Sequence, residues 1–482
     1  MPQELGLLLV FLLVFLFDTF LPKKAQSSLS IFTCVVFALF TVANVVMSGT
    51  GTSFAGMYEQ TEATYAMKLI LNAGMLIVLI QATKWANSEF VAVRRGEFYE
   101  LLLATLLGMY IMISARHFLL FVIGLETASL PLAALVAFDK KHYESHEAAA
   151  KYMFTAVFSS AIFMLGLSFV YALAGSLYFN DIAVNIMGGQ SALLVVALVF
   201  VIAGVGFKLS LVPFHLWTAD VYQGAPTAVT SYLSVISKGA AAFAFLVILA
   251  QVFGSAYSAA WEWMLYAVIV LTITIGNLFA IRQRDLKRFL AFSSISQAGY
   301  IMLGVIAASE VGMASLMFYV LVYVFSNLAA FGVIAAIENK TGKVNMDDYN
   351  GLFKTNPWLA FSMMLAMFSL AGIPPFAGFF SKWYLALGAI QNGQYLYVAV
   401  LIISSLLSAI YFFRIFERLF MGEKTVEEPA VLVAPEAKRE KPEVPLRMLI
   451  PVGIAALMVI ALGLGNSFIV NGILKTTVMG VL

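Results

Sequence analysis

Charged residues are scarce in this sequence. Only 11% of its 482 residues are charged and 62% are hydrophobic, whereas an average soluble domain has about 25% charged residues. Cysteine is almost absent, because Cys34 is the only one, and a single thiol excludes both a disulfide within the chain and a cysteine-based metal cluster. The net charge of +2 creates no basic field of the kind that captures nucleic acid. A soluble domain, a disulfide scaffold and a nucleic-acid-binding protein are therefore excluded.

The sequence instead contains long apolar runs. They are hydrophobic on every side over about 20 residues, the length that a helix needs to cross roughly 30 Å of hydrocarbon. Lipid offers the backbone no hydrogen-bond partners, so such runs are expected to be helices. The first run has no basic segment before it and no cleavage site after it, so we expect a membrane helix rather than a removed signal peptide. The sequence predicts an all-α polytopic membrane protein with fourteen apolar runs, at residues 4–22, 28–48, 64–85, 98–115, 117–138, 148–174, 192–219, 226–253, 259–281, 287–308, 312–337, 357–390, 394–419 and 447–474.

The distribution of Lys and Arg predicts how the chain crosses the membrane. Basic residues accumulate in cytoplasmic connections, and most of the 28 Lys and Arg residues lie in the odd-numbered connections. The even-numbered connections and the C-terminal tail hold only Lys68, Arg116 and Lys475. Both termini should therefore face away from the cytoplasm. The connection 421–446 is rich in Pro, Glu and Lys and is expected to be a flexible cytoplasmic linker before a separate last helix.

Two of the apolar runs contain prolines well inside them. Pro213 lies in the seventh run, and Pro374 and Pro375 lie in the twelfth. Each proline removes a backbone donor and crowds the carbonyl four residues earlier, here those of Leu209, Leu370 and Ala371. Broken helices five runs apart indicate an internal repeat. Because five is odd, the second copy is expected to be inverted in the membrane, as in transporters.

Four lysines lie inside apolar runs and not in connections: Lys151, Lys208, Lys238 and Lys382. A lysine at the bilayer centre costs roughly 2.5–3.5 kcal/mol on insertion scales, so these side chains should face protein or water. Desolvation disfavours the ammonium form, which suits such lysines to exchanging protons. The alternative is snorkelling to an interface. It is weak for Lys208, which lies about 11 residues, or roughly 16 Å, from the next polar turn, and stronger for Lys382, whose run is long.

One carboxylate lies in the middle of an apolar run. Glu126 occupies the fifth run, where we expect it to pair with Lys151. A charge-coupled pair of this type sets the proton affinity of the groups next to it. The alternative is a static buried ion pair that fixes helix register, but such a pair leaves Lys208, Lys238 and Lys382 without partners.

His215 follows the first break by two residues. It could relay protons or bond a carbonyl freed by Pro213, and beside Lys208 and Lys238 we favour the relay. The other histidines, His117, His142 and His146, fall in turns. We expect them at the surface, and we predict no metal site.

Several motifs become recognisable together. The stretch GFKLSLVPFHLWTADVYQGAPTAV occurs with GLETASLP, AAAKYMF, SKGAAAF, GNLFAIRQRDLKRFLAFSSISQAGY and SLAGIPPFAGFFSKWY, all between residues 95 and 420. By these motifs the chain resembles the subunit N family of bacterial NADH:quinone oxidoreductase, respiratory complex I. The sister subunits M and L share the architecture, but their seventh-run motif reads differently, and a glutamate in place of Lys382 would have suggested subunit M.

The resemblance implies an antiporter-like fold with two inverted five-helix repeats, broken helices 7 and 12, and a polar axis at mid-membrane depth. By motif, Glu126 and Lys151 resemble the coupling pair, Lys208 the central proton-carrying lysine, Lys238 a bridging lysine and Lys382 the terminal one, and His215 matches the histidine after the break. The implied divisions are three N-terminal transmembrane helices in 1–97, a first repeat in 98–253, a second in 259–420, the linker 421–446 and a C-terminal transmembrane helix in 447–482.

Other positions match the family less closely. Asn277, Lys287 and Arg288 match its GNL and KR positions, to which we assign structural or gating roles. Ala219 stands where the family usually has proline, and Gln297 stands where subunit N often has histidine. Glutamine does not titrate, although it can organise a water chain.

The resemblance implies a proton-translocating subunit that couples electron transfer from NADH to quinone, elsewhere in the complex, to proton transport. This chain would hold no cofactor, and partner subunits would hold NADH, FMN, iron–sulfur clusters and quinone. The implied setting is the bilayer of a bacterial inner membrane, with antiporter-like and small membrane subunits of complex I on its flanks. Two alternatives stay open: a subunit of a multi-subunit cation/proton antiporter without a redox partner, and a membrane scaffold whose charges only register helices.

Overall fold

The predicted apolar runs correspond to helices in the computed structural model, which describes residues 1–20, 27–46, 49–186, 192–254, 258–307, 309–391, 393–421 and 444–479. Within these residues, 13 helices are long and apolar enough to cross a membrane. The predicted twelfth run forms two shorter helices, so all fourteen runs are accounted for and the all-α class is confirmed. Most of the predicted linker 421–446 lies outside the described residues.

The membrane helices and their short companions follow one another along the chain. In order they are α1 (Pro2–Phe20), α2 (Ser28–Val46), α3 (Glu62–Ala86), α4 (Arg95–Ser114), α5 (Phe118–Val136), α6 (Tyr143–Ala174), α7 (Phe179–Asn185), α8 (Ala192–Leu209), α9 (Leu216–Gly224), α10 (Thr227–Tyr232), the π-helix η3 (Leu233–Ser237), α11 (Lys238–Val252), α12 (Ser258–Arg282), α13 (Leu286–Ile306), α14 (Glu310–Thr341), α15 (Leu352–Thr355), α16 (Pro357–Ala371), α17 (Ala377–Gln391), α18 (Tyr395–Met421), α19 (Leu446–Leu464), the π-helix η5 (Phe468–Leu474) and α20 (Lys475–Val478). Two 3-10 turns complete the description, η2 (Ala92–Arg94) and η4 (Met346–Tyr349).

A small hairpin between α2 and α3 was not predicted. Its strands β1 (Gly51–Ser53) and β2 (Tyr58–Gln60) pair antiparallel, with Thr52 opposite Glu59. The next turn at this end also differs from expectation. His117 is buried rather than at the surface, because its ring caps α5 and packs edge-on against Tyr178 at 4.5 Å.

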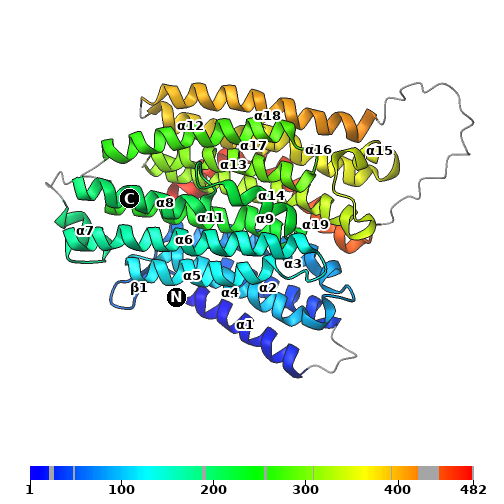
Figure 1. The fold of residues 1–482 in the computed structure, drawn as a ribbon, viewed down its shortest axis with the longest axis horizontal. Helices are drawn as coiled ribbons and strands as arrows, with labels where there is room; N and C mark the ends of the chain where they lie inside the picture. The colour runs from blue at the N-terminus through cyan, green and yellow to red at the C-terminus, as the bar shows by residue number, and fades with distance from the viewer. Residues whose placement is uncertain are drawn as a thin grey trace, which may run out of the picture.

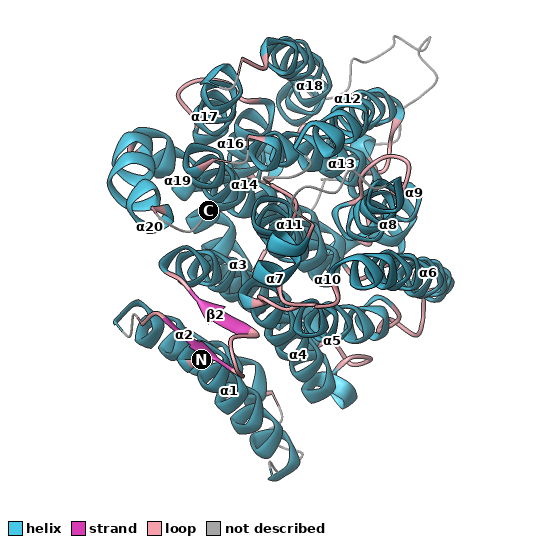
Figure 2. Cartoon of the chain, turned by 90° about the vertical axis from the view of Figure 1, so that its left-hand side faces the viewer, coloured by secondary structure: helices cyan, strands magenta, loops and turns pink. Residues whose placement is uncertain are grey.

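Three helical segments form the centre of the bundle. All residues of α13 except Arg288 are buried, and so are 94% of the residues in the most apolar 18-residue stretch of α14 and of the segment Thr227–Val252. The outer helices α1, α2, α6 and α18 bury only about a third of their residues or less, and their remaining apolar side chains suit a lipid environment. Figure 2 shows this arrangement nearly end-on, with α11 and α14 inside and α1, α6 and α18 at the rim.

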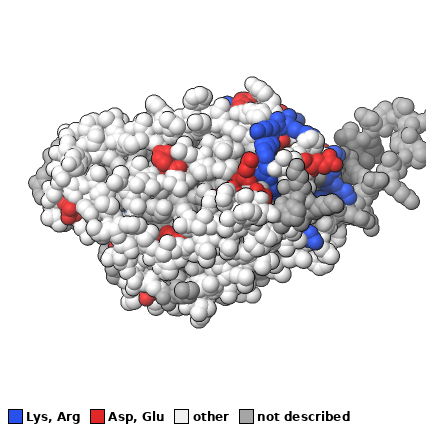
Figure 3. Space-filling model, turned by 90° about the horizontal axis from the view of Figure 1, so that it is seen from below, with Lys and Arg blue, Asp and Glu red and all other residues white. Residues whose placement is uncertain are grey.

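The two ends of the bundle differ in charge. The helices run along the horizontal direction of Figure 1, where β1 and both chain ends are marked toward the left. On the face drawn in Figure 3, Lys and Arg side chains gather at the right-hand end. We call this the basic end and the opposite one the hairpin end. Basic residues accumulate on the cytoplasmic side, and the orientation of the termini stays a prediction.

In each of two helix pairs, a glycine allows the two helices to pack closely. A Cβ on Gly108 of α4 would lie 2.4 Å from the Ala128 nitrogen of α5, and one on Gly276 of α12 would lie 2.6 Å from the Ser296 nitrogen of α13. Small residues allow helix backbones to come this near. The chain then continues alike in both halves, since α6 packs on α8 and α14 packs on α16. This parallel supports an internal repeat, whose inversion stays a prediction.

Candidate functional site

The first predicted break lies between α8 and α9. Helix α8 ends at Leu209, Ser210 has a positive φ of 62°, and α9 begins at Leu216. The Phe207 carbonyl of the last turn accepts hydrogen bonds from the Trp217 indole at 3.1 Å and from the Ser210 backbone at 2.9 Å. The Phe207 carbonyl at this break is therefore satisfied by Trp217 and Ser210 and not by a lysine.

Lys208 lies in the last turn of α8 and points into the bundle. It is 4% exposed, so the alternative of snorkelling is wrong. Its Nζ donates to Ser129 Oγ at 2.8 Å and to the Tyr152 hydroxyl at 3.4 Å. Glu126 lies one turn before Ser129 on the same face of α5 and acts electrostatically on Lys208. The Glu126 Oε1 is buried and has no hydrogen-bond partner among the described residues.

The expected pairing of Glu126 with Lys151 is wrong. Lys151 Nζ instead forms ion pairs with Asp220 of α9 at 2.6 Å and with Glu147 at 2.8 Å. Its side chain is 42% exposed, because α6 has 32 residues and is longer than the hydrocarbon core requires. Lys151 therefore lies near the basic end, and the carboxylate group that acts on Lys208 belongs to Glu126.

Lys238 opens α11 directly after the π-helical turn η3. It is 1% exposed, and its Nζ donates to Ser294 Oγ at 2.7 Å and to the Ser294 carbonyl at 3.2 Å. The Tyr222 ring lies 5.5 Å from the same ammonium group, and the Tyr323 hydroxyl donates to Ser294 Oγ at 2.8 Å. A π-turn widens a helix and is frequent at functional sites, and here it precedes the lysine.

The second break lies between α16 and α17, and Lys382 fills it. Its Nζ donates to the carbonyls of Leu370 at 3.3 Å and Ala371 at 2.9 Å. These are the carbonyls that the sequence predicted to be crowded by Pro374 and Pro375. Lys382 is 5% exposed, so the alternative of snorkelling is wrong for this residue too.

A small polar cavity lies beside Lys382. Its volume is about 10 Å³, and it is lined by Gln297, Tyr323, Ser326, Ser369 and Lys382 among others. A space of this size and polarity suits one water molecule. Gln297 accepts a hydrogen bond from the Tyr319 hydroxyl and donates to the Leu370 carbonyl at 3.3 Å. The cavity therefore lies between two groups: Ser294, which binds Lys238 and accepts from Tyr323, and the backbone carbonyls that bind Lys382.

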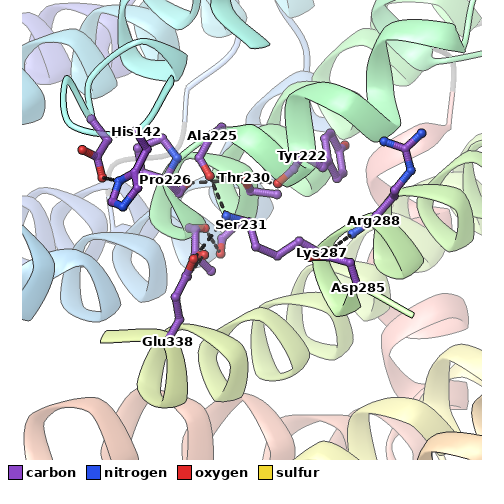
Figure 4. A network of polar contacts seen from close by, with 12 residues as sticks. His142, Tyr222, Ala225, Pro226, Thr230, Ser231, Asp285, Lys287, Arg288 and Glu338 are labelled. Carbon is purple, nitrogen blue, oxygen red and sulfur yellow. Dashed lines mark hydrogen bonds and ion pairs between the residues drawn. The ribbon is translucent and has the colours of Figure 1, made fainter. Parts of the chain in front are cut away.

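A larger cavity opens near the basic end. It has a volume of about 510 Å³, and Asp285, Lys287 and Glu338 are among its lining residues. Lys287 Nζ donates to the Ala225 carbonyl at 2.8 Å, and the Thr227 hydroxyl donates to Glu338. Figure 4 shows the Lys287 side chain of α13 reaching toward Ala225, with Ser231 of α10 and Glu338 of α14 nearby. Burial raises the pKa of Asp285, which caps α13 by accepting from the Arg288 backbone.

A stripe of hydroxyl groups runs inward from this cavity. Ser231 Oγ donates to the Thr227 carbonyl and Ser234 Oγ to the Ser231 carbonyl, each at 2.8 Å, and Asn327 Nδ2 donates to Ser234 Oγ at 2.7 Å. Residues 227, 231 and 234 share one face of a helix with Lys238. We call this set the hydroxyl stripe.

The remaining predicted residues are placed as follows. His215 occupies the N-cap position of α9 but makes no capping hydrogen bond through its side chain, and its buried Nδ1 has no hydrogen-bond partner among the described residues. Asn277 Nδ2 donates to Ser404 Oγ at 2.7 Å and its Oδ1 accepts from Tyr411 at 2.9 Å, which is a structural arrangement. Arg288 donates to Asp220 at 2.6 Å.

Sequence reasoning missed two residues of this polar system. Asp220 was taken as part of a polar turn, although it holds both Lys151 and Arg288. Lys68 was assigned to a connection, but it lies in α3 with no exposure and pairs with Glu4 of α1. The position of Glu4 near the start of an apolar run was the only available signal.

Comparisons with known proteins bear on this arrangement. Residues 115–408 match the family described as NADH:quinone oxidoreductase/Mrp antiporter, transmembrane. The chain is 53% identical to NADH-quinone oxidoreductase subunit N of Phocaeicola vulgatus, over 87% of this chain and 89% of the relative. The chain belongs to the NADH-quinone oxidoreductase subunit N family. The subunit N of Azobacteroides pseudotrichonymphae is 50% identical, over 88% of this chain and 89% of the relative.

Solved structures agree with the subunit N fold. A chain of respiratory complex I from Thermus thermophilus matches with a TM-score of 0.80 and 29% identity, covering 97% of this chain and 98% of that one. A chain of the Mrp complex from Dietzia matches with a TM-score of 0.85 at 22% identity, covering 99% of this chain and 96% of that one. The second match shows the fold alone.

Proposed function

We infer that this subunit N family member is a proton-translocating membrane subunit of a bacterial NADH:quinone oxidoreductase. The observation that supports this function best is the row of three buried lysines, Lys208, Lys238 and Lys382. Each is held by neutral hydroxyl or carbonyl groups inside the bundle. Buried ionisable groups inside a membrane bundle are typical of ion and proton pathways.

The contacts of these lysines suggest the direction of transfer. The hydroxyl stripe supports proton uptake from the cavity at the basic end toward Lys238. From Lys238, the groups of Ser294 and Tyr323 lead to the cavity beside Lys382. Water molecules in such spaces complete a proton path between polar side chains.

Glu126 is the group through which we expect coupling to act on this path. Glu126 lies on α5 and acts electrostatically on Lys208. Its buried Oε1 has no hydrogen-bond partner among the described residues, so it can accept a hydrogen bond from a group of a partner subunit. A nearby charge changes which protonation state of a lysine is favoured. Redox chemistry in partner subunits, which would hold NADH, FMN, iron–sulfur clusters and quinone, would change the charge near Glu126 and thereby move the proton of Lys208.

This function implies a setting and an organisation for the chain. The inner membrane of a bacterium is its expected location, with both termini on the non-cytoplasmic side and other membrane subunits of complex I on its flanks. The segments 98–253 and 259–420 act as the two inverted repeats, after three N-terminal helices in 1–97 and before the last helix in 447–482. His215 remains a candidate relay beside the break, and Lys151 is assigned to the ion pairs of the basic end.

The experiment that tests the function replaces Lys208 in the assembled complex. Lys208→Ala should lower both proton pumping by membrane vesicles and coupled quinone reduction, with the complex still present on a native gel. Lys340→Ala is the matched control, because Lys340 is exposed at the end of α14. Unchanged pumping by assembled Lys208→Ala complex would refute a proton-carrying role.

The Mrp-type antiporter is the second candidate, because the fold is shared. The relatives at 50–53% identity favour the redox complex. Co-migration of the chain with NADH dehydrogenase activity on a native gel supports the redox complex. Migration without that activity favours the antiporter.

A further inference from the structure

A carboxylate of the cavity at the basic end contacts the hydroxyl stripe. Glu338, near the end of α14, lines this cavity and is 30% exposed. Its Oε2 accepts a hydrogen bond from the hydroxyl of Thr227, which is the first residue of both α10 and the stripe. The Glu338 side chain therefore joins the open cavity to the first hydroxyl of the stripe.

Neutralisation of Lys287 does not by itself explain Glu338. The Lys287 ammonium group donates to the Ala225 carbonyl at 2.8 Å and lies 3.4 Å from Glu338 Oε1. Figure 4 shows both side chains ending near Ser231. Because Glu338 is partly exposed, solvent screens this ion pair, and screened pairs contribute about 0–1 kcal/mol. The nearer partner of Lys287 is a neutral carbonyl, so the contact of Glu338 with Thr227 still needs an explanation.

The stripe has a second hydroxyl at the same cavity. Thr227 and Ser231 both line it, and they lie one turn apart on α10. The two side chains are 6% and 2% exposed. A cavity of about 510 Å³ has room for several water molecules, and water can bridge polar side chains that are not in direct contact. A proton at Thr227 can therefore reach Ser231 through water in this cavity.

A carboxylate suits the entrance to such a path. The hydroxyls of Thr227 and Ser231 do not ionise near neutral pH, so they can pass a proton on but cannot store one. Glu338 can take up a proton and release it, and it bonds the stripe directly. A side chain positioned to accept and release a proton speeds proton transfer by about 10²–10⁴-fold. Glu338 therefore has both the chemistry and the contact that proton uptake requires.

Charged and titratable groups face Glu338 from several elements. Lys287 lies on α13 and Asp285 caps the same helix, and the charge of Glu338 acts on both Asp285 and Tyr349 of η4. The other titratable residues that line the cavity are Asp139, His142 and Glu144. Glu144 belongs to α6 and is exposed. Among the described residues, the Thr227 hydroxyl donates to Glu338 and not to Glu144, so Glu144 shares the cavity but not the contact with the stripe.

We propose that Glu338 is the proton-loading residue of this subunit, which takes protons from water in the cavity and delivers them to the hydroxyl stripe at Thr227. The proposal rests on the proposed function and names the residue at which proton uptake begins. Water in the cavity gives a proton to the Glu338 carboxylate, which becomes a neutral acid. The acid donates that hydrogen to Thr227 Oγ1, the hydrogen of the Thr227 hydroxyl passes to water beside Ser231, and the Glu338 carboxylate is restored.

The test measures proton pumping per NADH oxidised by the assembled complex in inverted membrane vesicles, whose outer face is the cytoplasmic one, where we expect the basic end. Glu338→Gln keeps an oxygen that can accept from Thr227 but cannot take up a proton. Pumping should therefore fall, and the loss should grow as the pH of the medium rises and free protons become scarce. Glu144→Gln is the matched control, because it removes the same charge from the same cavity, and it should pump normally at every pH. Normal pumping by Glu338→Gln, an equal loss in both variants, or a loss that does not depend on pH would overturn the proposal.

A second variant keeps the proposal testable if Glu338→Gln does not assemble. Thr227→Val keeps the shape of the side chain and removes only the hydroxyl that links Glu338 to the stripe. The same loss of pumping is expected, whereas normal pumping would again overturn the proposal. Lys208→Ala, measured in parallel, separates the two hypotheses. Normal pumping in that variant would refute the proposed function itself, and loss there with normal pumping in Glu338→Gln would refute only the loading residue.

Discussion

The contact between α4 and α5 should control proton transfer at Lys208, although neither helix carries that lysine. A Cβ added at Gly108 would lie 2.4 Å from the Ala128 nitrogen, 2.7 Å from the Gly124 carbonyl oxygen and 2.7 Å from the Thr127 carbonyl carbon. All three atoms are backbone atoms, so no side chain can rotate away. We therefore expect Gly108→Ala to push the two helices apart.

The size of the effect follows from these distances. An ordinary contact of a Cβ needs about 3.4 Å, so α5 must move by about 1 Å, and overpacking of this kind costs about 1–3 kcal/mol. Alanine alone would favour the helix by up to about 1 kcal/mol over glycine, which offsets only part of that cost. Because Ser129 lies on α5, a shift of that size would stretch its 2.8 Å bond to Lys208 beyond hydrogen-bonding distance.

The assay measures proton pumping and assembly in the same membranes. Gly108→Ala should lower pumping per NADH oxidised and lower the thermal midpoint of the complex. Gly453→Ala on α19 is the matched control, because nothing lies within 4 Å of its added Cβ. Equal stability and equal pumping in the two variants would show that α5 does not position Glu126 and Ser129 for Lys208.

Other variants test the remaining contacts. Gly372→Ala places a Cβ 3.0 Å from Lys382 Cδ at a φ of +87°, and a side chain at this positive φ costs about 1–2 kcal/mol for the backbone alone. Proton pumping and the thermal midpoint should both fall. Normal values of both would contradict the tight fit of Lys382 in the break. Asp220→Asn removes partly exposed ion pairs with Lys151 and Arg288, so the complex should lose no more than about 1 kcal/mol of stability and its thermal midpoint should hardly change. A large drop in the thermal midpoint would mean that the basic end is more buried in the assembly. Gln297→His should retain pumping, because an imidazole can accept from Tyr319 and donate to the Leu370 carbonyl as Gln297 does; a variant that assembles but does not pump would show that the amide is required.

The helix count and both breaks could be predicted because each depends on local chemistry. Apolar length determines which runs become membrane helices, and proline removes a donor wherever it stands. The crowded carbonyls of Leu370 and Ala371 were predicted on this ground, and the structure adds that Lys382 is their donor. This donor could not be predicted, because Lys382 lies 12 residues after Leu370 and 11 after Ala371, beyond the break.

The pairing of charges could not be predicted, because it depends on the depth of each residue in the bundle. Lys151 lies inside an apolar run but on a helix of 32 residues, and its extra length carries the lysine out to Asp220. Lys68 lies near the start of its run, where a count of connections places it outside, but the β1–β2 hairpin covers it. A hairpin of this length has little signal in a membrane sequence, so the burial of Lys68 was not foreseeable.

The acceptors of each lysine separate the groups that can pass a proton from those that only hold position. Lys151 is bound by two carboxylate groups, so loss of its proton would leave uncompensated negative charge. Lys238 and Lys382 are bound by hydroxyl and carbonyl groups, which remain neutral whether the lysine is charged or not. Lys208 is bound by hydroxyls too, but a carboxylate, that of Glu126, also acts on it. If the proposed function holds, we therefore expect a change in charge at Glu126 to act first on Lys208, and we propose the α5–α8 contact as the place where coupling begins.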